Sequence, residues 1–271
     1  MSESEGFVLL FSVILGVAGA VINRTGALHP LYFRDNPGPG IIRLAVLLAM
    51  AWIGYVLWRH ADPSVVGIYV VFYLVMGYGV VKMFGQTVAM AYGARTRVDA
   101  AERRNVPAAL VVGAFTLATG LIFGGSVWGE ADPTGEGEGG WWIPVSFFLL
   151  GWIVLVIVFG LFLRREPGRL TQRLQQERCL DDARAAAFFL LACASVLTDA
   201  VAGDFWGWTH ALLTFGVLAV LLMVREAFAR QSAAATGTEE PRRLVESGAY
   251  LLLGVGAWWA NRMLDGSFGP G

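Results

Sequence analysis

The residues of this sequence whose types could support chemistry are a few polar side chains inside long apolar blocks. Lys82 and Gln86 are four positions apart, so a helix would place them on one face. Asp199 lies near the end of another block, and Asp204 follows just beyond it. Ionisable side chains within a membrane are costly and mark functional sites by default. Lys82 and Asp199 are therefore candidates for two ends of a polar path for an ion or proton. The alternatives are a lysine that reaches the headgroups and an aspartate that is solvated at the outer surface.

The remaining reactive groups give little support to an enzyme. Gly124-Gly-Ser126 contains a serine, but no histidine occurs in a suitable span to act as its base. Cys179 and Cys193 are too far apart in a helical chain to form a disulfide, and neither has a partner at metal or redox spacing. The three histidines fall in loops or at interfaces, which disfavours haem ligation: His29, His60 and His210. We therefore expect no enzymatic activity, no cofactor and no metal site.

Two glycine motifs and one acidic loop have structural interpretations. Met76-Gly77-Tyr78-Gly79 shares a tripeptide with potassium-channel filters, but it lacks the preceding threonine and valine and lies within a helical block. Small residues for helix packing explain it better, as they do Gly120-Leu-Ile-Phe-Gly124. Four carboxylates in residues 129–140 lack the ligand register of a calcium loop, so a solvated turn is favoured.

The composition indicates what kind of protein positions these residues. The chain has 271 residues, of which 56% are hydrophobic and 15% are charged. Soluble proteins have about 25% charged residues, so this chain is too apolar for that class. Lys82 is the only lysine among the 20 basic residues, and no arginine run has the aromatic interleaving of a nucleic-acid surface. A membrane protein is indicated, and nucleic-acid binding is disfavoured.

Eight apolar blocks approach the roughly 20 residues that a helix needs to cross a bilayer. The acidic N-terminus predicts that the first block is a retained span and not a cleaved signal peptide. The first and last blocks are short or interrupted, with Glu246 in the last, and the third is overlong. The blocks are residues 7–22, 41–58, 65–92, 106–128, 141–163, 183–202, 206–228 and 244–260.

Arginines gather in alternate loops between these blocks. Seventeen of the 20 basic residues fall in four such loops, and only Arg59 and Arg262 fall clearly on the other side. Because basic loops stay in the cytoplasm, both termini are predicted to face outward, into the periplasm. Eight of the ten tryptophans fall at the opposite ends of the helices, where headgroups favour aromatic rings. The arginines expected to contact lipid or a partner protein are Arg95, Arg97, Arg103, Arg104, Arg164, Arg165 and Arg173.

The third basic loop, residues 168–184, contains good helix formers throughout. We expect it to extend the sixth span into the cytoplasm, with Pro167 marking the break before it. Such a basic helix can contact anionic lipid or a partner protein, and a solvated connector is the alternative.

The helices that follow the basic loops begin in a similar way. Asn105 precedes the fourth block, and Asp181 or Asp182 takes its place before the sixth; both residue types accept hydrogen bonds from free amides. Pro107 suits a first helical turn. The pattern predicts an all-α fold, a polytopic membrane helical bundle of about eight transmembrane helices. It consists of one membrane domain with four parallel two-helix hairpin repeats, residues 6–60, 64–129, 141–203 and 206–263.

The segment 98–129 carries the most specific motif of the chain. Its residues are Asn105, Pro107, Gly113, Gly120, Gly124 and Trp128. This motif resembles the bacterial inner-membrane family catalogued as domain of unknown function 350, which has an Asn-x-Ala-x-Ala-like loop and a glycine-studded span in each two-helix unit. The match is degenerate in the third unit and is little more than spacing in the first and fourth. The resemblance implies a bacterial inner-membrane location and about eight spans, with a weak link to envelope-stress and membrane-remodelling partners, but no activity.

The sequence thus favours a non-enzymatic scaffold or a subunit of an envelope complex. Such a protein would be homo-oligomeric or bound to a membrane-complex partner, in contact with lipid, and docked through its arginine-rich loops. The alternative is a channel or transporter for a small ion that uses Lys82 and Asp199.

Overall fold

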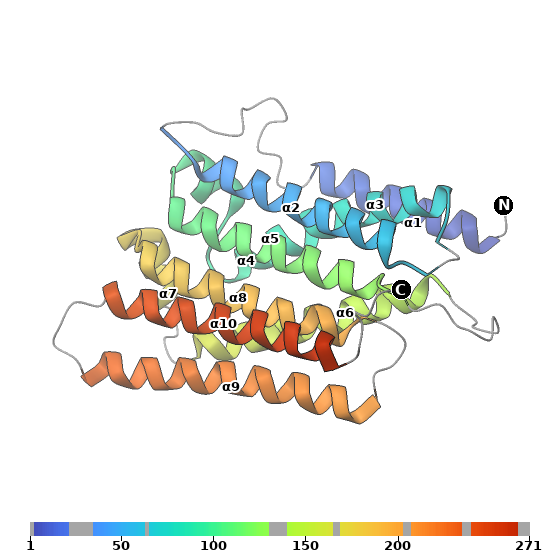
Figure 1. The fold of residues 1–271 in the computed structure, drawn as a ribbon. Coiled ribbons are helices and arrows are strands. Elements are labelled where there is room, and N and C mark those ends of the chain that lie inside the picture. Colours follow the sequence, from blue (N-terminus) through green and yellow to red (C-terminus); the bar gives the residue numbers. More distant parts are fainter. Residues whose placement is uncertain are drawn as a thin grey trace.

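The computed structural model describes residues 3–21, 35–62, 65–129, 140–164, 169–202, 207–234 and 240–264, and within these ranges it contains helices and no strands (Figure 1). The α-helices are α1 (Glu3–Val21), α2 (Gly38–Arg59), α3 (Ile68–Val80), α4 (Gln86–Ala91), α5 (Val106–Ser126), α6 (Trp142–Leu163), α7 (Arg169–Gln172), α8 (Leu180–Ala200), α9 (Gly207–Ala234) and α10 (Glu240–Leu264). Three π-helical segments accompany them: η1 (Val81–Gly85), η2 (Thr96–Glu102) and η3 (Arg173–Glu177).

Six helical segments of the described chain are long and apolar enough to cross a membrane. They are α2, the combined segment Ile68–Ala91, α5, α6, α8 and the part of α9 from Leu212 to Arg230. The apolar part of α1, Gly6–Val21, is shorter, and α10 carries charged residues in its first turns. The structure therefore agrees with the predicted helical membrane bundle. The number of eight spans and the fourfold repeat stay predictions.

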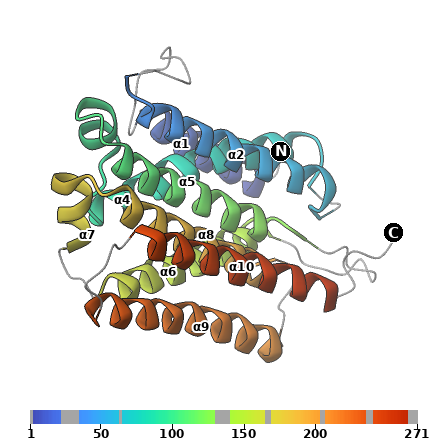
Figure 2. The same ribbon diagram turned by 60° about the vertical axis from the view of Figure 1, so that its left-hand side comes forward.

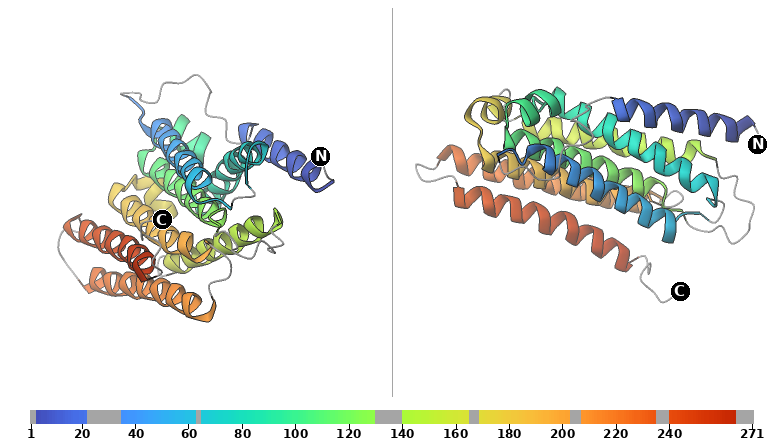
Figure 3. Two further views of the ribbon diagram at one scale, coloured as in Figure 1. Left: turned by 45° about the vertical axis from the view of Figure 1, so that its right-hand side comes forward. Right: turned by 90° about the horizontal axis from the view of Figure 1, so that it is seen from above.

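Four helices lie side by side in one row, in the order α2, α5, α8, α10 (Figures 1 and 2). The colours advance in the same direction along all four, so these helices are parallel. α1 packs on α3, and α6 contacts α5 and α8; Figure 3 shows α1, α3 and α6 on the same side of the row. α9 contacts α8 and α10. In the apolar stretches of α5 and α8, 78% and 72% of residues are buried, against 22–44% in the other spans. The core is therefore centred on α5 and α8, and the outer helices leave much of their apolar surface exposed.

Small residues allow α5 to lie close to α2. A Cβ atom on Gly120 would collide with Ala49 of α2, and one on Gly124 would collide with the ring of Trp52. Gly113 faces the same helix two turns earlier. This close contact agrees with the helix-packing interpretation of the glycine motif.

The Met76–Gly79 motif also lies at helix contacts. A Cβ atom on Gly79 would collide with the backbone of Leu15 in α1. One on Gly77 would lie 3.0 Å from Cδ1 of Ile53 in α2. The motif belongs to the α-helix α3, so its glycines make room for neighbouring helices and do not form an extended ion filter.

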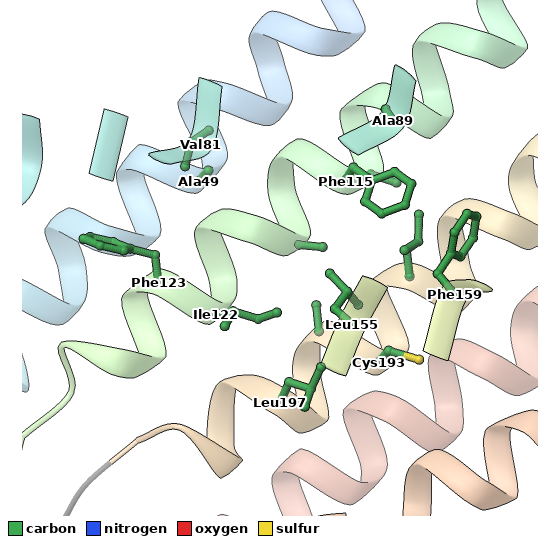
Figure 4. Close-up of a cluster of buried hydrophobic side chains, with 14 of the residues drawn as sticks. Ala49, Val81, Ala89, Phe115, Ile122, Phe123, Leu155, Phe159, Cys193 and Leu197 are labelled. Atoms are coloured by element: carbon green, nitrogen blue, oxygen red, sulfur yellow. The ribbon is translucent and has the colours of Figure 1, made fainter. Parts of the chain in front are cut away.

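Aromatic side chains of α5 and α6 occupy the centre of the core (Figure 4). Phe115 and Phe159 meet edge to face, with ring centroids 4.9 Å apart. The ring of Tyr92, just after α4, stacks on Phe115 at 5.7 Å, and its hydroxyl donates a hydrogen bond to the carbonyl of Val156 at 2.9 Å. Cys193 of α8 is fully buried nearby and acts as a small core residue. These contacts join the end of α4 to α5 and α6 at one level of the bundle.

The segment before α8 differs from the prediction. α7 and η3 form a short helix that ends at Glu177, and Arg178 then adopts a left-handed backbone with φ 51°. A left-handed residue ends a helix and redirects the chain. Leu170 and Leu174 are buried, so the short helix packs against the bundle. The prediction that residues 168–184 extend the sixth span is therefore wrong.

The two ends of the bundle differ in composition. The last turns of α2, α5 and α10 meet the first turns of α6 and α9 at one end (Figure 1). Tryptophans lie at this end: Trp58, Trp128, Trp141, Trp142, Trp208, Trp258 and Trp259. The first turns of α2, α5, α8 and α10 lie at the opposite end together with η2 and η3, and we call this the arginine-rich end. The segregation agrees with the sequence pattern, whereas the orientation in a membrane stays a prediction.

Candidate functional site

A cluster of buried charges joins α9 to α10 at the arginine-rich end. Glu246 of α10 is 1% exposed. Its carboxylate accepts hydrogen bonds from Nη1 of Arg225 at 3.0 Å and from Nη1 of Arg243 at 2.8 Å. The hydroxyl of Tyr250 donates a third bond at 2.7 Å. Because Arg225 comes from α9 and the others come from α10, these bonds hold the two helices together.

Asp182 of α8 extends this cluster. Its Oδ1 lies 2.9 Å from Nη2 of Arg243, and its Oδ2 lies 2.7 Å from Nη1 of Arg173 in η3. Arg173 also approaches the half-exposed Glu177 at 3.9 Å. Positive and negative charges therefore alternate from α9 through α10 and α8 to η3. We call this the buried ion network: Arg173, whose side chain is 22% exposed, and the buried residues Asp182, Arg225, Arg243, Glu246 and Tyr250.

α6 contacts the network through an aromatic ring. The guanidinium carbon of Arg225 lies 4.6 Å from the ring centroid of Phe162, a cation–π distance. A cavity of about 10 Å³ lies beside Phe162, Asp182 and the two arginines of α9 and α10. This volume admits about one water molecule and leaves no space for a substrate.

Each of the two carboxylates of the network is paired with two guanidinium groups. Buried charges require such pairing, because an uncompensated charge in a protein interior costs several kcal/mol. Among the described residues no group of three His, Cys, Asp or Glu side chains could hold a metal ion.

Next to the network, two arginine-bearing loops fold against each other. Nη2 of Arg178 donates a hydrogen bond to the carbonyl of Arg103 at 3.1 Å. Nδ2 of Asn105 donates one to the carbonyl of Leu174 at 2.6 Å. The loops before α5 and α8 are thus parts of one surface. Its exposed arginines form what we call the arginine platform: Arg97, Arg103, Arg104 and Arg178.

A buried carboxylate anchors the platform. Asp99 is fully buried and lies 3.3 Å from Nε of Arg95 and 3.4 Å from Nη1 of Arg103. It also accepts a hydrogen bond from the backbone N–H of Arg95 at 2.9 Å. Arg97 pairs with Glu102 at 3.0 Å in an exposed position. The side chains of Arg95 and Arg103 remain 44% and 53% exposed, so anchoring leaves them accessible to a partner.

α5 and α8 begin with the same backbone geometry. Each has 21 residues and follows an arginine in left-handed conformation, Arg104 with φ 52° and Arg178 with φ 51°. Asn105 then caps α5 by accepting a hydrogen bond from the amide of Ala108 at 3.0 Å. Two turns of similar design thus present the arginine loops of the second and third predicted units.

Cys179 occupies the capping position before α8. Burial raises the pKa of its thiol, so the thiol is protonated at neutral pH. Because Cys179, and not an aspartate, has the position before α8 that Asn105 has before α5, the prediction that Asp181 or Asp182 replaces that asparagine is wrong. Asp182 lies one turn into the helix, where the buried ion network uses its carboxylate.

The predicted transport residues are buried in two helical segments, Ile68–Ala91 and α8. Lys82 belongs to η1 and is 9% exposed, whereas Gln86 begins α4 and is 1% exposed. Asp199 lies in the last turn of α8 and is 4% exposed. Their role in transport stays a prediction.

The structure does not bring the lysine and the aspartate to one site. Gly85, between Lys82 and Gln86, packs on Thr116 of α5, whereas Thr198 packs on Gly125. Thr116 and Gly125 are nine residues apart, which is about two and a half helical turns. η1 and the end of α8 therefore contact α5 at different levels along its axis.

The predicted contact arginines divide into three groups. Arg95, Arg97, Arg103 and Arg104 lie together around η2. Arg173 is drawn into the buried ion network, and Arg164 is exposed at the end of α6. Asp204, Arg165 and Pro167 lie outside the described residues.

Sequence reasoning missed the centre of the buried ion network. By sequence, Glu246 is only an interruption of the last apolar block, and Arg225 and Arg243 are two of the seventeen basic residues counted in the four loops. Glu246 could have been selected by the criterion that selected Lys82, because it is also an ionisable side chain within an apolar block.

Comparison with known proteins adds no assignment. No family model, no curated protein and no solved structure matches the chain. The resemblance of residues 98–129 to the family of domain of unknown function 350 stays a prediction that rests on its motif.

Proposed function

We propose that this protein is a multi-pass scaffold of the bacterial inner membrane that docks an acidic surface of a partner protein on its arginine platform. In this proposal the chain forms four parallel two-helix hairpins, with α1 and α10 supplying the first and last spans. Both termini face the periplasm, so the platform lies in the cytoplasm. The protein performs no catalysis and belongs to an oligomer or a membrane complex.

The folded state of the platform carries this proposal. Its loops are joined by the Arg178–Arg103 and Asn105–Leu174 hydrogen bonds and are anchored by Asp99. A preformed surface loses less loop and side-chain entropy on binding than a flexible one. Guanidinium groups bind carboxylates in bidentate geometry, and clusters of them recognise acidic motifs. The geometry supports an acidic protein segment as the partner.

Replacing the platform arginines by glutamine is expected to remove the partner. The variant changes Arg97, Arg103, Arg104 and Arg178 together. If each lost charge lowers the binding free energy by about 0.4 kcal/mol, the four changes together weaken binding at least about tenfold. The measurement is mild-detergent extraction of tagged protein from native membranes, quantification of co-purified proteins by mass spectrometry, and titration of the recovered partner.

Arg59→Gln provides the control, because this exposed arginine lies at the tryptophan end. It should leave partner recovery unchanged. Equal recovery with wild type and with the fourfold variant, or no reproducible partner at all, would contradict docking on the platform.

Ion transport is the second candidate, and the surroundings of Lys82 favour it. Oε1 of the neighbouring Gln86 is buried without a hydrogen-bond partner in the described part of the chain. Lys82 itself lies in a π-helical segment, a distortion that is frequent at functional sites. A polar group of this kind inside an apolar span fits a path for a small ion.

A liposome flux assay distinguishes this candidate from docking. If the protein is a transporter, the wild type should carry a monovalent or divalent cation, and Lys82→Met and Asp199→Asn should each abolish that flux. Arg97→Gln should carry the ion normally. A wild type that carries none of the common ions would leave docking as the function.

A further inference from the structure

A groove opens between α6 and α9 at the arginine-rich end. Its volume is about 530 Å³, within the range of small-molecule sites. Leu161 of α6 and Leu222 of α9 form apolar walls, and Arg164, Arg225 and Glu226 supply polar groups. Both helices are among the segments that are long and apolar enough to cross a membrane. The groove is therefore placed where a spanning helix ends and the headgroup layer begins.

Positive charge predominates at the mouth of this groove. Arg164 is exposed there, while Arg225 is held by Glu246 and forms a fixed inner wall. The carboxylate that lines the groove, Glu226, accepts a hydrogen bond from Nε of Arg230 at 2.7 Å. Two of the arginines are thus offset by carboxylates, and Arg164 adds a further positive charge.

Apolar side chains continue from the groove toward the middle of the two helices. Ile157 lies one turn before Leu161 on α6, and Phe215 lies two turns before Leu222 on α9; both are exposed. Exposed side chains of this size gain free energy when acyl chains cover them. A positive mouth at the end of an apolar strip complements a molecule with an anionic head and hydrocarbon tails.

We propose that this groove binds an anionic phospholipid, with its phosphate at Arg164 and Arg225 and an acyl chain along Leu161 and Leu222. Basic pockets between transmembrane helices on the cytoplasmic side bind anionic headgroups in this way. The site is separate from the arginine platform and does not depend on a partner protein. Because Arg225 also belongs to the buried ion network, the lipid phosphate contacts the group that joins α9 to α10.

The test uses full-length protein that has been delipidated in a neutral detergent, with native mass spectrometry to count bound molecules. Dioleoylphosphatidylglycerol is compared with dioleoylphosphatidylcholine, and glycerol 3-phosphate tests the free phosphate. We expect one phosphatidylglycerol to bind about fivefold more tightly than phosphatidylcholine, the factor that one arginine contributes near a membrane surface. Glycerol 3-phosphate should bind far more weakly, because it lacks the acyl chains.

Two variants and one control locate the site. Arg164→Gln should weaken phosphatidylglycerol binding about fivefold and leave phosphatidylcholine binding unchanged. Leu222→Trp should fill the groove and weaken both lipids. Arg97→Gln removes an exposed arginine from the platform and should change neither. Equal binding of the two lipids, equal effects of Arg164→Gln and Arg97→Gln, or equally tight binding of glycerol 3-phosphate would overturn the proposal.

Discussion

Replacing Glu246 by alanine is expected to lower the free energy of unfolding by about 3–5 kcal/mol, the usual cost of removing one partner from a buried ion pair. The carboxylate is 1% exposed and binds two guanidinium groups. Without it, Arg225 and Arg243 face each other with less counter-charge, and the hydroxyl of Tyr250 loses its acceptor. The adjoining cavity of about 10 Å³ admits too little water to replace these bonds.

Glu102→Ala is the matched control for this experiment. It removes a glutamate side chain from an exposed ion pair, in which Arg97 is 76% and Glu102 is 54% exposed. Such pairs contribute about 0–1 kcal/mol, so this variant should resemble the wild type. Denaturant titration of both variants in mixed micelles, followed by tryptophan fluorescence, measures the difference. Unfolding of the two variants at the same denaturant concentration would show that the network does not stabilise the bundle.

Gly120→Ala is expected to destabilise the protein by about 1–3 kcal/mol, the usual cost of overpacking a well-packed contact. The added methyl group would collide with Ala49 of α2. α5 cannot easily shift away, because Gly124 lies against Trp52 one turn later. The Nε1–H of Trp52 also donates a hydrogen bond to the carbonyl of Leu121 at 3.2 Å. The expected sign is informative, since alanine in place of glycine normally stabilises a helix by about 0.5–1 kcal/mol.

Gly216→Ala shows what the same change does without a neighbour. Gly216 lies in α9, and a Cβ atom there would have no heavy atom within 4 Å. This variant should be neutral or more stable by up to about 1 kcal/mol. The midpoint of thermal unfolding in detergent compares the two. Equal shifts in the same direction would mean that α2 and α5 do not meet closely at Gly120.

The sequence alone was sufficient to locate most of the helices. The blocks predicted at residues 106–128 and 141–163 correspond to the helices Val106–Ser126 and Trp142–Leu163. This agreement has a local cause. A segment in hydrocarbon must satisfy its backbone hydrogen bonds internally, so an apolar run of sufficient length is a helix whatever its neighbours are. The tryptophan and arginine ends follow from the same solvent preferences of single residues.

Hydropathy and helix propensity were less informative for helical segments that contain charged residues. α10 contains Arg243 and Glu246, which lower its hydropathy, so hydropathy alone does not identify it clearly as a transmembrane helix. In the structure both side chains are nearly fully buried, because α8 and α9 supply their partners. The short helix before α8 shows the converse, since helix-forming residues predicted a continuous helix that the left-handed Arg178 ends.

The sequence by itself thus located most of the helices and determined the charge of each end of the bundle. Only the tertiary structure decided which of those charges meet. Arg243 and Asp182 are 61 positions apart in the chain, and their pairing depends on the parallel packing of α8 and α10. The same packing placed the segments that carry Lys82 and Asp199 at different levels along α5. Contacts between helices are set by the fit of side chains across an interface, and no periodicity within one helix records its partner.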